Sequence, residues 1–417
     1  MTASREALAE DTGDTPPYDT VALVLQGGGA LGSYQAGVYQ GLHEAGIRPN
    51  WISGISIGSI NAAIIAGSPE DERVERLRGF WESICRPAGF ASVPWGDTLA
   101  GMFEGIPFGF GSPAMNGQLS AFQALFSGQP GFFKPRFPPP YWVHGKGAAS
   151  TSFYDTTPLA ATLRRFIDFD LLNSGSVRAS FGVVNVRSGN FAYFDSGTHT
   201  LGPEHIMASG ALPPGFAPVH IDGEDYWDGG IVSNTPLQYV LDEHERDERL
   251  LVLQVDLFSA RGGLPRTMGE VLARQKDIQF SSRTRMNTDV LATNLNLQER
   301  LTELLQSLPA EQRRNPAVEL LCAQLQHAPI DIVQLIYRHK PYELDSKDYE
   351  FSRITVEEHW EAGMRDLERS FTNREWLRRV SHGAGVTTWD LREPDNPRVR
   401  HPGPAKPPAA PRQPQAR

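Results

Sequence analysis

The chain has 417 residues, of which 40% are hydrophobic, 10% aromatic and 21% charged. This length allows two or three domains, and the composition is that of a globular protein rather than a fibre, a coiled coil or a disordered chain. The formal net charge of -10 at pH 7 excludes nucleic acid as an expected main partner, because binding a polyanion requires clustered Lys and Arg side chains.

The number of cysteines and the residues at the start of the chain indicate which cellular compartment to expect. Cys85 and Cys322 are too few for a disulfide framework or a zinc site, which suits a reducing environment. Residues 1–18 lack the basic and apolar pattern of a secretory leader, and Val21–Leu25 is too short to cross a bilayer. We therefore expect a cytoplasmic protein, with disorder at residues 1–18 and in the proline-rich tail at 390–417.

The first predicted elements alternate between strand and helix. Thr20–Leu25 is an apolar run that predicts a buried strand, and residues 32–46, with apolar side chains four apart, predict a helix. Trp51–Ile55 predicts a second strand, and Ile57–Ala66 a second helix. This alternation is typical of an α/β fold with a parallel sheet.

The next stretch, residues 86–150, is rich in Gly, Pro and aromatic residues. A long irregular insertion of this kind is typical of a lid or a binding loop. After it, the pattern predicts a helix at 158–166, a strand hairpin at 180–195 and a buried strand at 250–257. Residues 261–389 are mostly helical in pattern, and we expect a smaller second unit or an extension of the first there.

A glycine cluster, Gly27-Gly28-Gly29-Ala30, separates the first predicted strand from the first helix. Glycines let a ligand approach main-chain N–H groups at a helix N-terminus, where aligned peptide dipoles favour negative charge. Three interpretations are open: a dinucleotide site with G-x-G-x-x-G spacing, a structural turn, and an oxyanion hole. A dinucleotide site also needs an acid at the end of the second strand, where Ser53-Gly54 stand instead.

The second predicted strand leads into Gly54-Ile55-Ser56-Ile57-Gly58. A serine on a sharp strand-to-helix turn needs small neighbours and presents its hydroxyl at the edge of the sheet, so Ser56 is a candidate nucleophile. G-x-S-x-G alone is a weak pattern. Its position one strand, turn and helix after the glycine cluster favours a shared site at the carboxyl ends of adjacent strands.

A nucleophilic serine needs a base. None of the eleven histidines shows a motif that pairs it with the serine. Those nearest before the best acidic candidate are His199, His205 and His220. Each is interpreted as a surface or structural residue. The acidic candidate is Asp228, which begins Asp228-Gly229-Gly230 after an aromatic strand, although Asp-Gly is also an ordinary turn dipeptide.

The glycine cluster, the serine turn and Asp228-Gly229-Gly230, in this order, resemble the patatin-like phospholipase family, as do Ala208–Ala211 and the prolines after them. The resemblance covers roughly residues 20–260. It implies a three-layer α/β/α sandwich with a mainly parallel central sheet at 19–260, followed by a mostly helical C-terminal extension at 261–389.

The resemblance also implies a serine-dependent lipid acyl-ester hydrolase of the phospholipase A or lysophospholipase type, without metal or organic cofactor. Ser56 would be the nucleophile and Asp228 the general base of a Ser-Asp dyad. The oxyanion hole would be made by the amides of Gly28 and Gly29, with Gly27 and Ala30 as further candidates. Four glycines would support the two turns: Gly54, Gly58, Gly229 and Gly230.

One position departs from the family pattern, since Leu31 stands where Arg or Lys is common. A less positive site mouth weakens the expectation of a phosphate-bearing substrate and favours another hydrophobic ester, such as polyhydroxyalkanoate oligomers. Two further interpretations stay open, a non-catalytic lipid-binding scaffold and a dinucleotide-binding oxidoreductase. Aromatic residues of the insertion would line an acyl channel, contact a membrane or lipid surface, or simply pack the loop on the sheet: Phe103, Phe108, Phe110, Phe132, Phe133, Tyr141 and Trp142.

Overall fold

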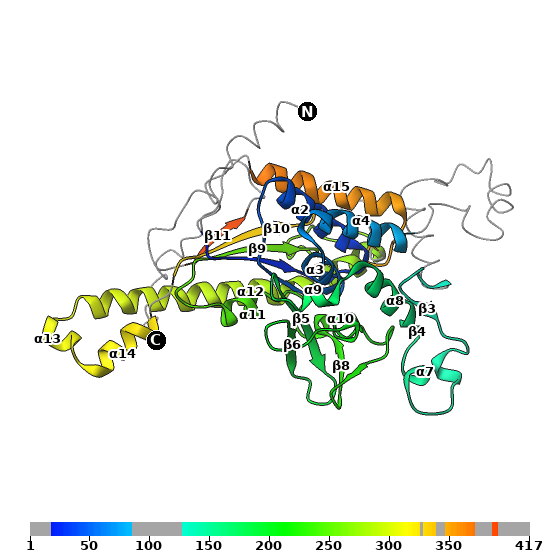
Figure 1. Cartoon of the computed structure of the whole chain (residues 1–417), viewed down its shortest axis with the longest axis horizontal. Helices are drawn as coiled ribbons and strands as arrows, with labels where there is room; N and C mark the ends of the chain where they lie inside the picture. Colours follow the sequence, from blue (N-terminus) through cyan, green and yellow to red (C-terminus); the bar gives the residue numbers. More distant parts are fainter. Residues whose placement is uncertain (1–17, 86–126, 326–327, 339–346, 372–385, 391–417) are drawn as a thin grey trace, which may run out of the picture.

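The computed structural model describes residues 18–85, 127–325, 328–338, 347–371 and 386–390. Its centre is a nine-stranded sheet with the strand order β11-β10-β9-β1-β2-β5-β8-β7, to which β6 is added by pairing with β5. Helices cover both faces of this mainly parallel sheet, which confirms the expected fold class (Figure 1). Nearly all of the two predicted disordered ends, and residues 86–126 of the predicted insertion, lie outside the described ranges.

The central strands are short and buried, as their apolar sequences require. β1 (Thr20–Leu25) and β2 (Trp51–Gly54) run parallel, with Leu25 opposite Gly54. β9 (Leu250–Asp256) is buried along its whole length and lies parallel to β1 on its other side. Because parallel strands end at the same edge, the glycine cluster after β1 and the serine turn after β2 leave the sheet side by side.

β5 (Arg178–Asn185) brings the antiparallel part of the sheet to the end of β2, where the serine turn begins. β2 pairs with its first half and ends with Gly54 opposite Phe181. β8 (Glu224–Asp228) runs antiparallel to its second half and ends with Asp228 opposite Val183. Since β6 (Phe191–Asp195) occupies the other edge of β5 along both halves, β2 and β8 share one edge. They run toward each other and end on either side of Gly182.

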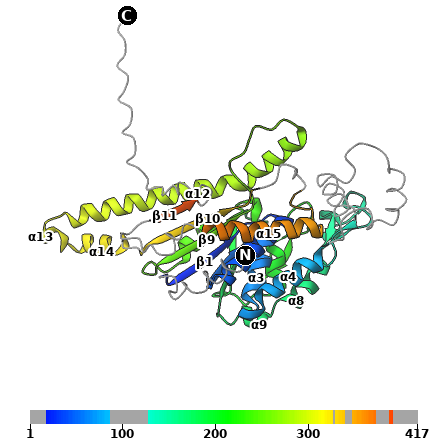
Figure 2. The same cartoon turned by 90° about the horizontal axis from the view of Figure 1, so that it is seen from above.

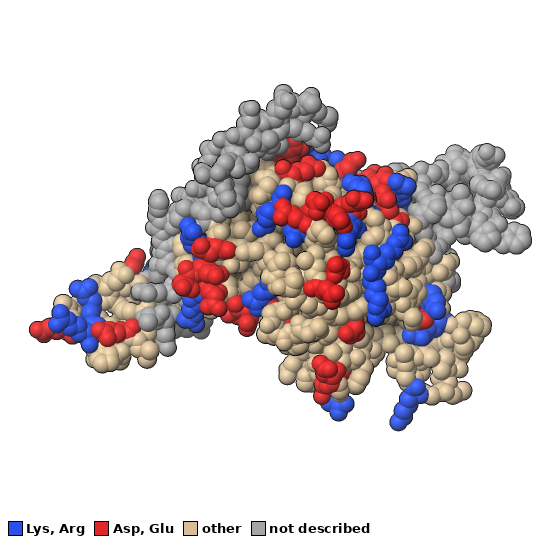
Figure 3. All heavy atoms as spheres, viewed as in Figure 1, with Lys and Arg blue, Asp and Glu red and all other residues tan. Residues whose placement is uncertain are grey.

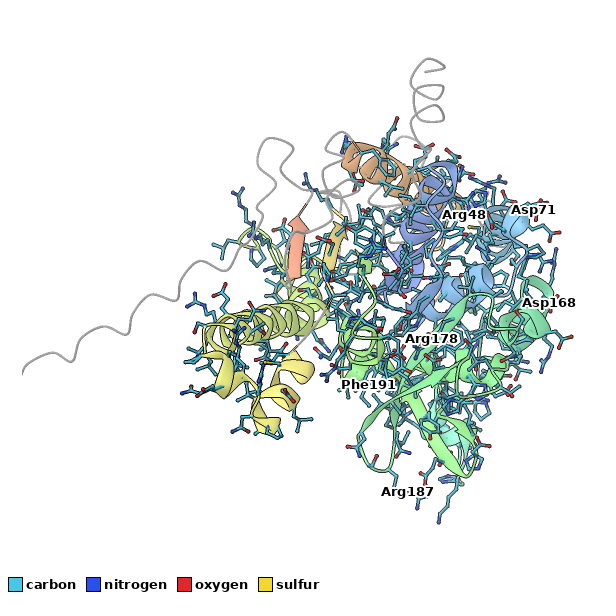
Figure 4. All side chains as sticks on the ribbon, turned by 60° about the vertical axis from the view of Figure 1, so that its left-hand side comes forward. Arg48, Asp71, Asp168, Arg178, Arg187 and Phe191 are labelled. Atoms are coloured by element: carbon cyan, nitrogen blue, oxygen red, sulfur yellow. The ribbon has the colours of Figure 1, made fainter. Side chains whose placement is uncertain are left out.

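The start of β5 is fixed by a buried network around Asp195. The Arg178 guanidinium pairs with the Asp195 carboxylate at 2.9 Å and lies over the Trp51 ring at 3.9 Å. The hydroxyls of Ser180 and Tyr239 donate to the same carboxylate at 2.7 and 3.1 Å. Figure 4 places Arg178 beside the sheet and Arg187 out at the tip of the β5–β6 hairpin. The network ties β5 to β2 and β6, and thereby fixes the point at which β8 ends.

One face of the sheet carries the larger core. Its helices are α2 (Gly32–Glu44), α3 (Ile57–Ala66), α4 (Arg73–Ile84), α8 (Thr157–Phe166) and α15 (Arg353–Ser370). α15 lies along α2 (Figure 1), and Figure 2 shows α15 from above; the two backbones approach closely. A Cβ on Gly37 would collide with the main chain of Trp360, and one on Gly363 with that of Tyr34. Small residues at these two positions therefore permit the contact.

The opposite face carries a smaller core beneath α11 (Leu237–Glu243), formed by residues such as Ala22, Val24 and Val252. The long helix α12 (Met268–Gln306) extends beyond the sheet, with α13 (Ala310–Arg313) and α14 (Pro316–Leu325) at its far end (Figure 1). Among the helices that the structure describes, none has the length and apolar character needed to cross a bilayer.

The C-terminal region is mainly helical, as expected, but it also adds strands to the central sheet. β10 (Ile330–Ile336) pairs parallel with β9, and β11 (Val386–Asp390) pairs parallel with β10. The sheet therefore continues across the predicted boundary at residues 260 and 261, and the division into two units stays a prediction. The remaining elements are short: η1 (Gly29–Leu31), η2 (Glu70–Glu72), β3 (Lys134–Pro135), η4 (Pro140–Trp142), α7 (Ala148–Thr151), β4 (Tyr154–Asp155), α9 (Phe169–Leu172), α10 (Pro203–Ser209), β7 (Val219–Ile221) and η5 (Gly229–Ile231).

Candidate active site

Ser56 occupies a strained turn between β2 and α3. Its φ is 55° and its ψ is -123°, a combination that residues with a Cβ rarely adopt. A Cβ on Gly54 would collide with the main chain of Gly58, and one on Gly58 with the carbonyl group of Leu25. Glycines on both sides thus allow the tight turn, which leaves the half-buried Ser56 at the end of the sheet.

A short segment at the end of α10, residues 209–211, holds the backbones of both predicted catalytic residues. The Ser56 N–H donates to the Ser209 hydroxyl at 3.1 Å, and this buried hydroxyl donates to the Gly182 carbonyl at 2.7 Å. Two residues further on, the Ala211 carbonyl accepts the Asp228 N–H at 3.1 Å. The place where β2 and β8 meet is therefore bridged by residues 209–211.

Asp228 is buried at the end of β8, with 2% of its surface exposed. Its carboxylate accepts the Gly230 N–H at 2.7 Å, and the Ser56 side chain lies close enough to it to affect its pKa. Burial raises the pKa of the Asp228 carboxyl from 3.8 to about 7, although the hydrogen bonds from Gly230 and Ser56 oppose this rise. A carboxylate with a pKa near neutrality is a better proton acceptor than an ordinary one.

The three histidines considered from the sequence lie elsewhere. His205 accepts the Gly202 N–H at 2.8 Å, and His220 contacts Asp225 at 3.0 Å. His199 contacts the neighbouring Thr198 hydroxyl at 2.8 Å. Within the described ranges, none of the hydrogen bonds of these three histidines reaches Ser56, whereas Asp228 lies beside it.

The glycine cluster turns beside Ser56, and its four amides fall into two sets. A Cβ on Gly27 would lie 3.1 Å from the Ser56 Cβ. The N–H groups of the buried Gly27 and Ala30 donate to the carbonyls of Asn234 and Asp348, at 3.2 and 2.8 Å. Gly28 and Gly29 are half-buried, and in the part of the chain that the structure describes their N–H groups have no acceptor. These two donors stand at the start of η1, which leads into α2, and the helix dipole favours an anion there.

Asn234 holds the glycine cluster from the side of η5. Besides the main-chain contact with Gly27, its Nδ2 donates to the Gly27 carbonyl at 2.9 Å, and its side chain is nearly buried. The segment after Asp228-Gly229-Gly230 contains this residue, but no sequence pattern assigned it a partner. Its contact with the cluster spans most of the domain and is visible only in the fold.

A strap from the C-terminal region, residues 347–350, crosses the glycine cluster. Besides accepting the Ala30 N–H, the Asp348 carbonyl would collide with any Cβ on Gly29, whose φ is 55°. The strap is tied to α12 by two ion pairs, Lys276 with Asp348 at 2.8 Å and Lys347 with Asp277. The second pair is almost fully buried, with side-chain exposures of 1% and 3%. Residues far along the chain therefore fix the candidate oxyanion hole.

Leu31, the position that departs from the family pattern, is fully buried in the larger core. Its side chain supplies packing and no charge. The Lys276–Asp348 pair beside the cluster has no net charge either. Among the described residues, no group of three or more His, Cys, Asp or Glu side chains is arranged to hold a metal ion.

Strand ends, a half-buried turn serine, a buried acid and open main-chain donors define a class of α/β protein with a candidate acyl-transfer site. A family profile described as "Patatin-like phospholipase" matches residues 23–241, more than half of the chain. A second profile, described as "Patatin phospholipase", matches residues 278–383. The protein belongs to the patatin-like phospholipase family, which confirms the resemblance seen in its motifs.

Curated relatives match over short stretches. Patatin-like phospholipase domain-containing protein ZK370.4 of Caenorhabditis elegans is 35% identical over 98 residues, 22% of this chain and 7% of the relative. Human patatin-like phospholipase domain-containing protein 6 is 34% identical over 94 residues, 22% of this chain and 6% of the relative. Triacylglycerol lipase ptl3 of Schizosaccharomyces pombe is 44% identical over 59 residues, 14% of this chain and 12% of the relative. The chain spans a small part of the length of each.

Two solved structures show distant likeness. VipD from Legionella pneumophila is 14% identical, with a TM-score of 0.35 over 87% of this chain and 67% of that one. Human GIVD cytosolic phospholipase A2 is 12% identical, with a TM-score of 0.36 over 90% of this chain and 62% of that one. Both scores are low, and the fold class follows from the sheet and helices described above.

Proposed function

We propose that the protein hydrolyses carboxylic esters of lipids, with Ser56 as nucleophile and Asp228 as general base. The observation that carries this proposal is the placement of the turn serine close enough to the buried carboxylate to lower its pKa, beside the Gly28 and Gly29 amides, which have no acceptor among the described residues. Membership of the patatin-like phospholipase family supports the same class of substrate. The relative named as a triacylglycerol lipase supports it further.

In the proposed reaction the Asp228 carboxylate accepts the Ser56 proton while the serine oxygen attacks the ester carbonyl. The tetrahedral oxyanion accepts hydrogen bonds from Gly28 and Gly29. Collapse of this intermediate breaks the ester bond, and the leaving alcohol takes the proton from Asp228. Asp228 then deprotonates a water molecule, whose attack on the acyl-serine releases the fatty acid and restores the Ser56 hydroxyl.

The four candidate amides are assigned different tasks in this proposal. Gly28 and Gly29 act as the oxyanion donors, because their N–H groups have no other acceptor in the described ranges. Gly27 and Ala30 instead hold the cluster in place through Asn234 and Asp348. A lost donor typically costs a few kcal/mol of barrier, so a preset pair of donors is a substantial part of the rate enhancement.

The surroundings of the dyad favour an apolar substrate. Leu212 and Ile231 follow Ala211 and Gly230 directly, and 40% and 44% of their surfaces are exposed. Together with the uncharged Leu31, they keep a second candidate open, hydrolysis of another hydrophobic ester such as a polyhydroxyalkanoate oligomer. A non-catalytic lipid-binding scaffold would not need a serine, Ser56, placed against a buried acid, Asp228. A dinucleotide-binding oxidoreductase has no support from the family match.

The test is turnover of p-nitrophenyl butyrate by the wild type, Ser56→Ala, Asp228→Asn and a control, Ser188→Ala, at an exposed hairpin serine. We expect both dyad variants to lose about 10³-fold or more of kcat/KM, because each removes a group that acts on the reacting atoms. A fluorophosphonate should label Ser56 in the wild type and in the control. Equal rates in all four proteins would exclude this site. Acid release from phosphatidylcholine, triacylglycerol and 3-hydroxybutyrate oligomers then separates the candidate substrates.

A further inference from the structure

Three large aromatic side chains lie exposed on one short segment near the site. Phe137, Tyr141 and Trp142 have 92%, 84% and 71% of their surfaces exposed. They belong to what we term the aromatic lobe, residues 127–155, which contains β3, η4, α7 and β4. Solvent exposure of three such rings leaves a large apolar area in water, and exposed patches of this kind mark interaction surfaces.

The aromatic lobe is joined to the segment that holds the dyad. The N–H groups of Phe153 and Tyr154 donate to the carbonyls of Pro214 and Gly215, at 3.2 and 2.9 Å. The Phe216 ring packs against those of Tyr154 and Phe133, with centroids 6.1 and 5.4 Å apart. The same loop begins after Ala211, whose carbonyl accepts the Asp228 N–H, so the lobe is held beside the candidate active site.

The charge of the lobe is opposite to that of the whole protein. Residues 127–155 contain Lys134, Arg136 and Lys146 against a single acid, Asp155, in a chain of net charge -10. The Arg136 guanidinium is used internally, because it donates to Ser152 and Tyr154, and Lys134 pairs with Asp155 at 3.2 Å. Lys146 is exposed. In Figure 3 the part of the molecule below and to the right, which carries β3, β4 and α7, is mostly tan with blue at its edges.

We propose that the aromatic lobe docks the protein on an anionic lipid surface. Aromatic rings favour the boundary between headgroups and acyl chains, where Phe137, Tyr141 and Trp142 would bury their exposed area. Lys146 would meet the negative headgroups. The proposal rests on the proposed function, since docking through the lobe brings the dyad beside its water-insoluble substrate.

Vesicle sedimentation tests the docking without any need for turnover. All proteins carry Ser56→Ala so that the vesicles stay intact, and the vesicles are phosphatidylcholine alone or mixed with phosphatidylglycerol. The variants are Phe137→Ser/Tyr141→Ser/Trp142→Ser and Lys146→Glu. The matched control is Leu264→Ser/Met268→Ser, which removes two side chains that are 90% and 71% exposed outside the lobe. Thermal unfolding checks that each variant is folded.

We expect the parent protein to bind the anionic vesicles more tightly and to release them at high salt. The triple variant should lose about tenfold or more in partitioning to both vesicle types, because the apolar contact is removed. Lys146→Glu should lose about fivefold or more on anionic vesicles only. The control should bind like the parent.

Binding unchanged in the folded triple variant, an equal loss in the control, or no binding by the parent protein would overturn the docking proposal. The wild-type hydrolysis of p-nitrophenyl butyrate is the independent test of the dyad. A protein that cleaves this soluble ester without binding vesicles loses only the docking proposal. One that binds through the lobe without cleaving the ester loses only the proposed function.

Discussion

The titration of Asp228 links the geometry of the dyad to activity. In the proposed reaction only the ionised carboxylate accepts the Ser56 proton, and burial raises the pKa of this carboxyl to about 7. We therefore expect kcat/KM for a soluble ester to rise with pH and level off above an apparent pKa near 7. The rate of fluorophosphonate labelling should follow the same curve. A profile that is already flat from about pH 5, one that an ordinary carboxylate produces, would contradict this expectation.

The same pKa shift has a cost in stability. The unfolded chain holds this carboxyl near 3.8, whereas the folded chain holds it at about 7, so between these values the folded state binds more protons. Its contribution to the free energy of unfolding therefore falls as pH rises from about 4 to about 7. Asp228→Asn, which carries no charge, should be about 1–3 kcal/mol more stable than the wild type at pH 8, with a gain that shrinks toward pH 4. Urea unfolding at both pH values measures the difference.

Ser209 is expected to act as a positioning residue. Ser209→Ala leaves the Ser56 N–H and the Gly182 carbonyl without the partner they now share. We expect kcat to fall about 10- to 100-fold with little change in KM, and Ser209→Thr to restore part of the loss. The matched control is Ser196→Ala, which removes a hydroxyl that accepts the Ala179 N–H at 3.0 Å away from the dyad. It should lower stability without this loss of kcat.

Among single residues, those that stand in short sequence motifs could be identified from the sequence. Ser56 and Asp228 stand in patterns of three to five residues, and the structure brings the two together. Their catalytic roles stay predictions. Ser209, Asn234 and Asp348 were not assigned contacts, because they act on the site through hydrogen bonds to main-chain atoms more than a hundred positions away. No local pattern records such a contact.

At the scale of elements, we expect activity to depend on the ion pair that ties the strap, residues 347–350, to α12. Lys347→Met removes one partner of the buried pair with Asp277, and breaking a buried pair on one side is strongly destabilising. A loosened strap would release the Ala30 N–H contact and disturb the neighbouring donors. We expect kcat to fall about 10- to 100-fold while KM changes little.

The exchange Asp277→Lys/Lys347→Asp is the rescue variant, because it keeps opposite charges at the two positions. It should regain part of the lost kcat. Arg365→Met, which breaks an exposed pair with Glu361 on α15, is the matched control and should leave kcat unchanged. If the control and Lys347→Met lose activity equally, the strap has no special relation to the glycine cluster.

The elements around the two motifs were predictable for a physical reason. β1, α2, β2 and α3 alternate within a short stretch, and their apolar patterns match their burial. The meeting of β2 and β8 at Gly182 was not predictable, because it depends on which edge of β5 the antiparallel strand takes. The addition of β10 to β9 likewise depends on pairing between strands that are distant in the sequence. An apolar run predicts a buried strand but not the strand with which it pairs.

For the whole molecule, the continuous sheet predicts that the expected hydrolase domain, residues 19–260, does not fold well alone. A chain ending after residue 260 would expose the edge of β9 that β10 now covers and the face of α2 that α15 covers. An open strand edge and a bared apolar face favour aggregation. We expect the shortened chain to be recovered in aggregates or to unfold at much lower urea than the full chain. A soluble shortened chain with full activity would show that the C-terminal region is dispensable.

The junction at Gly182 bears on how this enzyme family can diversify. The spacing between the proposed nucleophile and the proposed base is set across a single residue of β5, not by the length of polypeptide that separates them in the chain. Insertions between positions 56 and 228 can therefore lengthen or change without moving either group. Changes in those loops can alter substrate preference while residues 56 and 228 keep their positions relative to each other.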